Sequence, residues 1–154
     1  MKLTNKFDIN KTKVPGTSMT FGTMIYKEAN RLRGLIVQEI DAYYNSYEPV
    51  VYKRTRAMRD SVEVANNITI DTTGMRLTID LNLTERAWHE SYYSEGSVIP
   101  LILLSYGWHT HGSFKDIYRF GYFEGANILQ NAVDKFNDSS KYGVTAEIKR
   151  IDYR

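Results

Sequence analysis

The chain has 154 residues, a formal net charge of +2 and no cysteine, with 42% apolar and 25% charged residues. This composition is typical of a single globular domain with its own hydrophobic core, not of a disordered chain. The absence of cysteine excludes a disulfide framework, a catalytic thiol and every cysteine-ligated metal centre. Aromatic residues make up 13% of the chain. Because aromatic side chains are enriched at protein interfaces, this content favours assembly with other proteins.

The charges are divided unevenly along the chain. Residues 1–60 contain 11 Lys and Arg against 6 Asp and Glu, whereas residues 61–154 contain 9 against 12. An ordinary solvated surface accounts for most such asymmetries. The alternative is that the two parts of opposite charge support head-to-tail contacts between copies, or docking on a charged partner.

Residues 1–20 are polar, contain the turn signal Val14-Pro15-Gly16 and show no period, which predicts an extended N-terminal arm. We expect a single domain over residues 21–154. The longest apolar run, Val98–Leu104, is interrupted by Pro100 and is far shorter than the roughly 18 residues of a membrane span. We therefore expect no signal peptide and no membrane contact.

An amphipathic helix is predicted over residues 22–47. Apolar side chains recur there at steps of three or four, the spacing that places them on one helical face: Ile25, Ala29, Leu32, Ile36, Ile40, Tyr43 and Tyr47. We expect Leu32 and Ile36 at the centre of the core. Thr20 or Thr23 is a suitable N-cap, and Glu48-Pro49 ends the helix because a residue before proline disfavours helical backbone.

Residues 62–83 predict a β-hairpin with one buried face, because their apolar residues alternate with polar ones. Apolar side chains occupy even positions before the turn and odd positions after it: Val62, Val64, Ile68 and Ile70, then Met75, Leu77, Ile79, Leu81 and Leu83. The turn is Asp71-Thr72-Thr73-Gly74.

Shorter elements are expected in the middle of the chain. Residues 84–97 indicate a loop or a short helical piece. Val98–Leu104 favours a buried helical turn opened by Pro100, with a buried strand as the alternative. A long loop is expected over residues 107–121, where no period is visible.

Two further elements complete the prediction. A second amphipathic helix begins at Tyr122 and ends in Asn137–Ser140, and a closing strand follows with Val144, Ala146 and Ile148 on one side. The predicted fold class is α+β: one domain with a mainly antiparallel β-sheet and two long amphipathic helices packed on one of its faces.

Two histidines are the first candidates for chemistry. His109 and His111 would point to the same side of a strand and offer two nitrogen ligands to a metal, with His89 or Glu90 as a third. Loop histidines that hydrogen-bond locally are the simpler interpretation. We predict no metal site and no cofactor.

A group of acidic residues and a lysine is the second candidate. Glu147 and Lys149, with Asp71 or Asp80 upstream, are similar to the acidic-x-Lys arrangement of metal-dependent nucleases. Alternating Glu and Lys on the solvent side of a strand is the simpler interpretation. The phosphate-loop, dinucleotide-binding and nucleophile-elbow motifs are absent from the sequence. We therefore predict a non-catalytic protein without catalytic residues and keep a metal-dependent nuclease, or another DNA-processing enzyme, as the alternative.

The third candidate is a basic cluster beside Tyr52, with four cations in seven residues: Lys53, Arg54, Arg56 and Arg59. Because these cations repel one another, we expect the cluster to be a protein interface that meets an acidic surface of a partner or a neighbouring copy. Arg54 is the strongest candidate, since a guanidinium can bind a carboxylate bidentately. An intramolecular salt bridge is the competing interpretation. A small nucleic-acid-binding interaction module is a further alternative.

A tyrosine-rich stretch of the chain is similar to a known family. Tyr47–Thr55 reads YEPVVYKRT, follows a long amphipathic helix, and resembles the Y-x-P-x-x-Y-x-R-T stretch of small structural proteins of tailed bacteriophages. These are the neck, head–tail joining or tail-completion proteins. Later segments agree with the family in their order along the chain: the apolar run before Tyr106-Gly107-Trp108, Phe120–Asn127 at the start of the last helix, and Phe136-Asn137 before the closing strand. The resemblance spans about residues 24–150.

The resemblance implies a function and a set of partners. It implies a non-catalytic virion protein that assembles in the host bacterial cytoplasm and forms a homo-oligomeric ring in the head–tail connector, in the neck or at the head-proximal end of the tail. The implied partners are portal, adaptor or head-completion proteins and tail-tube proteins. Passing contact with genomic DNA in the lumen of the ring is also implied.

Overall fold

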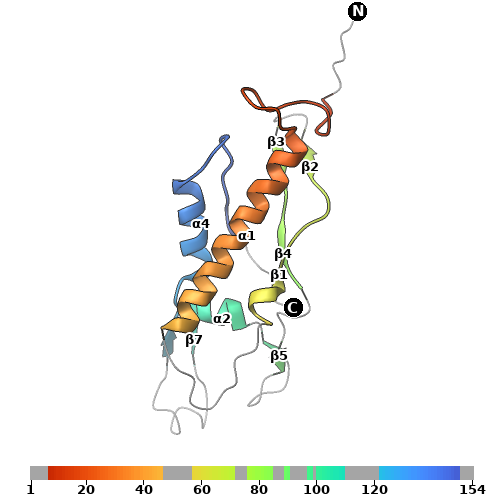
Figure 1. The fold of residues 1–154 in the computed structure, drawn as a ribbon. Helices are drawn as coiled ribbons and strands as arrows, with labels where there is room; N and C mark the ends of the chain where they lie inside the picture. Colours follow the sequence, from red (N-terminus) through yellow and green to blue (C-terminus); the bar gives the residue numbers. More distant parts are fainter. Residues whose placement is uncertain are drawn as a thin grey trace, which may run out of the picture.

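A computed structural model describes residues 7–46, 57–71, 76–84, 89–90, 97–98, 100–109 and 122–149. Its longest element is helix α1, Phe21–Asn45, which runs along the whole domain (Figure 1). The predicted first helix is confirmed. Thr20 is the N-cap, and its hydroxyl oxygen accepts a hydrogen bond from the Thr23 amide at 3.3 Å.

The buried face of α1 follows the predicted period. Ile25, Ala29, Ile36 and Ile40 are buried, and Ile40 is fully so. Ile36 belongs to the core cluster as expected, but Leu32 is only partly buried at its edge, so the core is centred about one turn further along the helix than expected.

Residues 7–20 precede α1 as a series of turns. The Val14 amide donates to the Met19 carbonyl at 2.9 Å, and the Gly22 amide, already in α1, donates to the Ile9 carbonyl at 2.8 Å. Val14 is buried by this arrangement. We expected an extended arm over residues 1–20; its described part instead folds back on the start of the helix.

The predicted hairpin is present as two pairs of antiparallel strands, but Ile70, which was expected on its buried face, is 42% exposed. After the 3₁₀-helix η1, Arg59–Ser61, strand β1, Val62–Val64, pairs with β4, Leu81–Leu83. Strand β2, Thr69–Asp71, pairs with β3, Arg76–Thr78. Between the two ladders, four residues lie between Val64 and Thr69 but only two between Thr78 and Leu81. The β1–β2 side of the hairpin therefore contains two extra residues. An insertion of two preserves the alternation of faces, which is why the sequence pattern runs unbroken through it.

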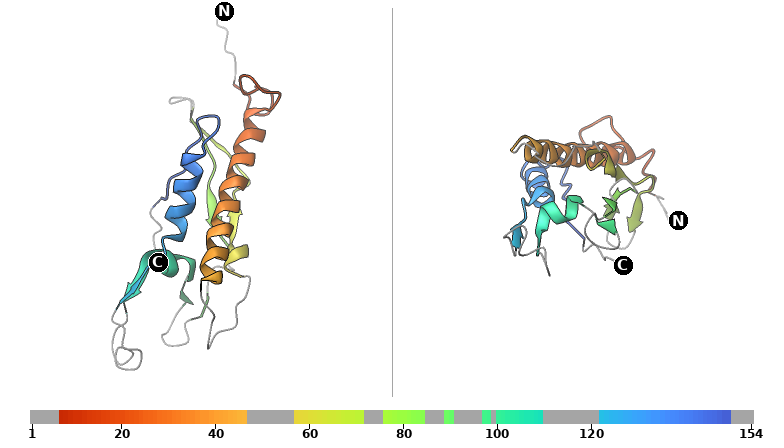
Figure 2. Two further views of the ribbon diagram at one scale, coloured as in Figure 1. Left: turned by 60° about the vertical axis from the view of Figure 1, so that its left-hand side comes forward. Right: turned by 90° about the horizontal axis from the view of Figure 1, so that it is seen from below.

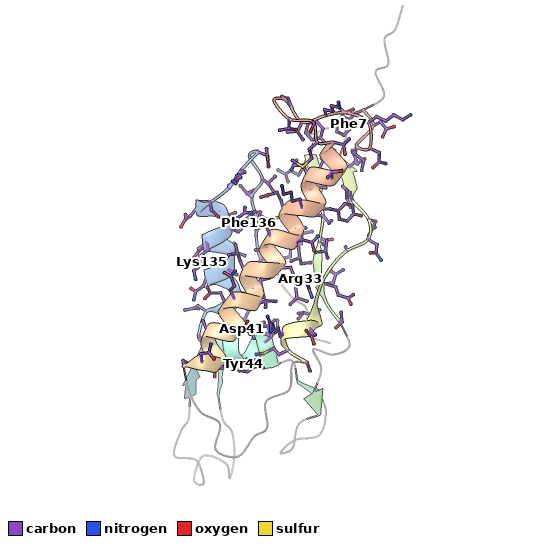
Figure 3. The ribbon with its side chains drawn as sticks, in the orientation of Figure 1. Phe7, Arg33, Asp41, Tyr44, Lys135 and Phe136 are labelled. Atoms are coloured by element: carbon purple, nitrogen blue, oxygen red, sulfur yellow. The ribbon has the colours of Figure 1, made fainter. Side chains whose placement is uncertain are left out.

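Helix α1 covers the outer edge of β1. Arg33, which faces the hairpin in Figure 3, donates a hydrogen bond from Nε to the Val62 carbonyl at 2.6 Å. The Tyr26 hydroxyl donates to the Asn66 carbonyl in the insertion at 2.5 Å. Both carbonyls belong to the β1 side of the hairpin, and side chains of α1 satisfy them in place of another strand. The helix and the hairpin are therefore joined by hydrogen bonds as well as by apolar packing.

The middle of the chain contains short strands that the sequence pattern did not indicate. Strand β5, His89–Glu90, pairs with β6, Ser97–Val98, where a loop or helical piece was expected. Helix α2, Pro100–Tyr106, confirms the helical interpretation of the apolar run.

The expected loop and second helix need a correction at their boundary. Strand β7, Gly107–His109, pairs with β8, Tyr122–Glu124, so the prediction of a helix starting at Tyr122 was wrong. Helix α4 is Ile128–Asp138 and ends where expected. Its N-cap, Asn127, has a left-handed φ of 53°, and its amide donates to the Ser105 carbonyl at 3.0 Å. The step-of-four pattern from Tyr122 to Ala126 therefore does not reflect helical backbone.

Residues 144–149 were expected to form a strand, and the structure shows no strand there. Their side chains alternate between partly buried and exposed, as predicted, but the backbone is paired by a side chain. Asn137 Nδ2 donates to the Ala146 carbonyl at 3.0 Å, and the Ala146 amide donates to Asn137 Oδ1 at 2.8 Å. The Asn137 carboxamide therefore makes the two hydrogen bonds to Ala146 that a neighbouring strand would otherwise make.

The two helices of the core run antiparallel, and side chains near the C-terminal end of α4 connect them (Figures 1 and 2). Lys135 of α4 forms an ion pair with Glu39 of α1. About two turns earlier on α1, Arg31 Nη1 donates to Ser139 Oγ at 2.9 Å. The Arg31 guanidinium also lies 4.0 Å from the centroid of the Phe136 ring. Figure 3 shows Lys135 and Phe136 of α4 beside α1.

One hydrophobic cluster joins these elements into a single α+β domain. Its buried members come from α1, α2, α4, β1 and the residue preceding η1: Ile36, Ile40, Met58, Val62, Leu101, Ile128 and Ala132. All strand pairs in the described part of the chain are antiparallel, and they form four two-stranded ladders instead of one continuous sheet.

Candidate interaction surfaces

Only one member of the predicted basic interface lies among the described residues. Arg59 Nη2 lies 3.3 Å from Asp41 Oδ2 of α1, with both side chains partly exposed (Figure 3). Asp41 therefore neutralises Arg59 within the same chain, as the competing interpretation held for the cluster. The other predicted interface residues lie outside the described residues: Tyr52, Lys53, Arg54 and Arg56.

The tyrosines that precede the family-like stretch are anchored in the domain. Tyr43 and Tyr44, in the last turn of α1, pack against the core cluster, and their ring centroids are 6.4 Å apart. The last turn of α1 is therefore held against the core by its tyrosines (Figure 3).

The residues proposed for a nuclease are only partly brought together. Lys149 Nζ lies 3.2 Å from Asp80 Oδ1, although 69 residues separate them. Asp71 is opposite Arg76 at the far end of the hairpin, and Arg76 is four residues, or about 13 Å at the usual rise of a strand, from Asp80. The Asp80–Lys149 pair is exposed. In the described ranges no three His, Asp or Glu residues are grouped to hold a metal ion.

Only one residue of the predicted histidine pair lies among the described residues. His109 is the last residue of β7, opposite Tyr122 in β8. His111 lies outside the described residues. The backbone of β7 was expected to be a loop, and its pairing places His109 on a strand.

A tight turn after α4 holds an exposed tyrosine that the sequence analysis did not single out. The Val144 amide donates to the Lys141 carbonyl at 3.3 Å, and the two residues between them, Tyr142 and Gly143, have φ of 60° and 68°. Two left-handed residues in succession define a type I′ turn. The Tyr-Gly dipeptide signals a turn in sequence, but not that a tyrosine takes the left-handed conformation.

Large apolar side chains are exposed at both ends of the domain. Among the described residues they are Ile70, Tyr106 and Tyr142, with exposed fractions of 42%, 51% and 44%. Ile70 is in β2 and Tyr142 in the turn after α4, both at the end where α1 begins. Tyr106 ends α2, which lies at the end where α1 finishes (Figures 1 and 2).

Comparison with known proteins gives no relative: no family model, curated protein or solved structure matches the chain. Among the described helices, none has the length and apolar character needed to cross a membrane.

Proposed function

We propose that this protein is a non-catalytic structural component of a tailed-bacteriophage virion. In this proposal it forms a ring in the head–tail connector, in the neck or at the head-proximal end of the tail. The observation that carries the proposal is the resemblance of Tyr47–Thr55, directly after a long amphipathic helix, to the Y-x-P-x-x-Y-x-R-T stretch of that family.

The architecture supports the proposal in two ways. First, two of the resembling segments have the expected structure, since a long helix precedes the tyrosine-rich stretch and the apolar run before Gly107 is helical, whereas Tyr122–Glu124 is a strand and residues 144–149 form none. Second, exposed tyrosines and an exposed isoleucine at both ends of the domain are the kind of side chain that protein contacts bury.

The direct test is to look for the protein in virions. Purified particles analysed by mass spectrometry should contain the chain at a stoichiometry of several copies. The recombinant chain mixed with the products of its flanking genes should give ring-shaped particles in negative-stain microscopy. Absence from purified virions would contradict the proposal, whereas a monomer in isolation would not, because neighbouring proteins can nucleate a ring.

The basic cluster gives a sharper variant. Arg54→Ala should leave the melting temperature of the monomer nearly unchanged and weaken assembly by about 1 to 3 kcal/mol per interface, because a desolvated carboxylate would lose its bidentate partner. Arg59→Ala is the matched control, since Asp41 already pairs with Arg59 and an exposed pair contributes at most about 1 kcal/mol. A large loss of monomer stability in Arg54→Ala, with assembly intact, would show an internal role.

A nuclease remains the second candidate because Asp80 and Lys149 lie side by side. Plasmid DNA incubated with the protein and Mg²⁺ or Mn²⁺ distinguishes the two functions. We expect no cleavage. Cleavage that is lost in Asp80→Asn and Glu147→Ala would replace the structural proposal by an enzymatic one.

A further inference from the structure

The type I′ turn of residues 141–144 holds Tyr142 in a strained conformation. Left-handed backbone crowds the Cβ atom of every L-residue except glycine, and asparagine tolerates it best among the others. The turn therefore favours Asn-Gly, and this chain has Tyr-Gly. At Asn127, the other non-glycine residue with positive φ in the described part of the chain, the sequence does use asparagine.

Tyr142 gains little from its own domain in return for this strain. Its side chain is 44% exposed, and within the described ranges it makes no hydrogen bond and no ring contact. Asparagine would occupy this position with less strain. The stability of the monomer therefore does not explain why an exposed tyrosine is found there.

The turn is nevertheless held rigidly. Ser140 Oγ donates to the Val144 carbonyl, and two hydrogen bonds between the Asn137 carboxamide and the Ala146 backbone fix the chain just beyond the turn. A tyrosine on a fixed backbone loses little conformational freedom when it binds, because only its two side-chain torsions remain to be ordered. Lys141, the residue before Tyr142 in the turn, is also exposed and carries a positive charge.

The other exposed tyrosine lies at the opposite end of the domain. Tyr106 ends α2, near the C-terminal end of α1, whereas the turn lies near the N-terminal end (Figure 2). Two exposed aromatic side chains at opposite ends of the domain suit a heterologous contact between identical copies, in which one end of each copy binds the other end of its neighbour. Exposed Asp60 in η1, at the same end as α2, provides a charge complementary to Lys141.

We infer that the turn carrying Tyr142 is a self-association site that binds the Tyr106 end of a second copy of this chain. This inference deepens the proposed function, on which it rests, by naming one contact of the ring. It predicts that the strain at Tyr142 is retained for assembly.

The first experiment separates assembly from stability. Sedimentation velocity over a concentration series should show self-association of the wild-type chain that Tyr142→Asn weakens at least tenfold. The same variant should melt at the same temperature as the wild type or higher, because asparagine relieves the strain. Tyr142→Phe is the matched control: it keeps the ring and should associate like the wild type. Unchanged association in Tyr142→Asn, or a wild-type chain that stays monomeric throughout the series, would overturn the inference.

The second experiment identifies the partner surface. In the full chain, Tyr142→p-benzoyl-L-phenylalanine should give on irradiation a cross-linked dimer, with the cross-link in the peptide that contains residues 100–109. A cross-link confined to another protein, or to a different region of the second copy, would contradict the inference. If the chain is found in virion rings but Tyr142→Asn assembles normally, this inference fails and the proposed function stands. If the chain is absent from virions but associates through Tyr142, the proposed function fails and the self-association site stands.

Discussion

Glu28 is a carboxylate with an exposed fraction of only 3%, and Arg31 is its cation. Arg31 donates to Glu28 Oε2 through Nε at 3.1 Å and Nη2 at 2.8 Å, while Nη1 binds Ser139. The same guanidinium covers the Phe136 ring, so one side chain both neutralises a buried charge and connects the two long helices.

Removing that cation should be costly. Arg31→Ala should lower the free energy of unfolding by about 3 kcal/mol, because it leaves a buried carboxylate without a partner. Lys27→Ala, one turn earlier on the exposed side of α1, is the control and should change stability by less than about 0.5 kcal/mol. Urea denaturation of the three proteins measures both values. Equal stability of Arg31→Ala and Lys27→Ala would show that water reaches Glu28.

Asn137 is the residue on which the last described segment depends. Asn137→Ala removes both hydrogen bonds to Ala146 and should cost about 1 to 2 kcal/mol. Amide hydrogen exchange should accelerate at Ala146 and leave the amides of α1 unchanged. Asn137→Asp keeps the acceptor but not the donor, so it should give an intermediate rate. Unchanged exchange at Ala146 in Asn137→Ala would mean that another group holds this segment.

At the scale of elements, two glycines of α1 have opposite surroundings. Gly34 lies in the exposed helix interior, and a Cβ added there would meet nothing within 4 Å. A Cβ added at Gly22 would lie 3.1 Å from Asn10 Oδ1 and 3.2 Å from the Ile9 carbonyl oxygen. Gly22 therefore allows the N-terminal turns to approach the helix closely.

The two glycines should respond oppositely to the same substitution. Gly34→Ala should stabilise the protein by about 0.5 to 1 kcal/mol, because alanine loses less backbone entropy in a helix and nothing obstructs its methyl group. Gly22→Ala should destabilise it, because the neighbouring backbone of Ile9 must move. Thermal melting followed by circular dichroism compares them. A loss of stability in Gly34→Ala would contradict the open surroundings of that position.

The elements that the sequence predicts well are those with a repeated apolar pattern. The spacing of Ile25 to Ile40 has one physical cause, a helix with one buried face, and the structure agrees with it. The hairpin is also recovered, because an insertion of two residues leaves its alternation intact. Prediction fails where one spacing is compatible with two structures. Tyr122 and Ala126 match a helical period, but they belong to a strand and a loop.

The candidate surfaces are harder to predict than the elements. The basic cluster is visible in sequence, but the pairing of Arg59 with Asp41 depends on how the chain after α1 returns to it. Likewise, Asp80 and Lys149 meet only because the segment after α4, which is bonded to Asn137 at Ala146, brings Lys149 to the connection between β3 and β4. The left-handed backbone of Tyr142 has no sequence signal, since tyrosine is uncommon there.

At the scale of the whole molecule, the helices and the hairpin share one hydrophobic cluster. Ile40 of α1, Val62 of β1, Leu101 of α2 and Ile128 of α4 all belong to it. An element that leaves this cluster exposes the apolar surface of the others, so none of them has an independent core.

The domain should therefore unfold in one cooperative step. Far-ultraviolet circular dichroism, which reports mainly on α1 and α4, and hydrogen exchange at the amides of β1 and β4 should give the same midpoint in urea. Ile40→Ala should move both midpoints together, by a loss of about 2 to 5 kcal/mol. Hairpin amides that exchange well before the helices unfold would show two separate units.

The length of α1 has a mechanical consequence. Its 25 residues extend over about 37 Å at 1.5 Å per residue, and continuous backbone hydrogen bonds connect one end to the other. Ion pairing to Lys135 and the Arg31 contacts brace it sideways against α4. A force applied along the helix axis therefore acts on α1, which α4 supports from the side, and not on loops. The two ends of the domain keep a fixed separation, and a displacement imposed on one end is passed on to the other with little give between them.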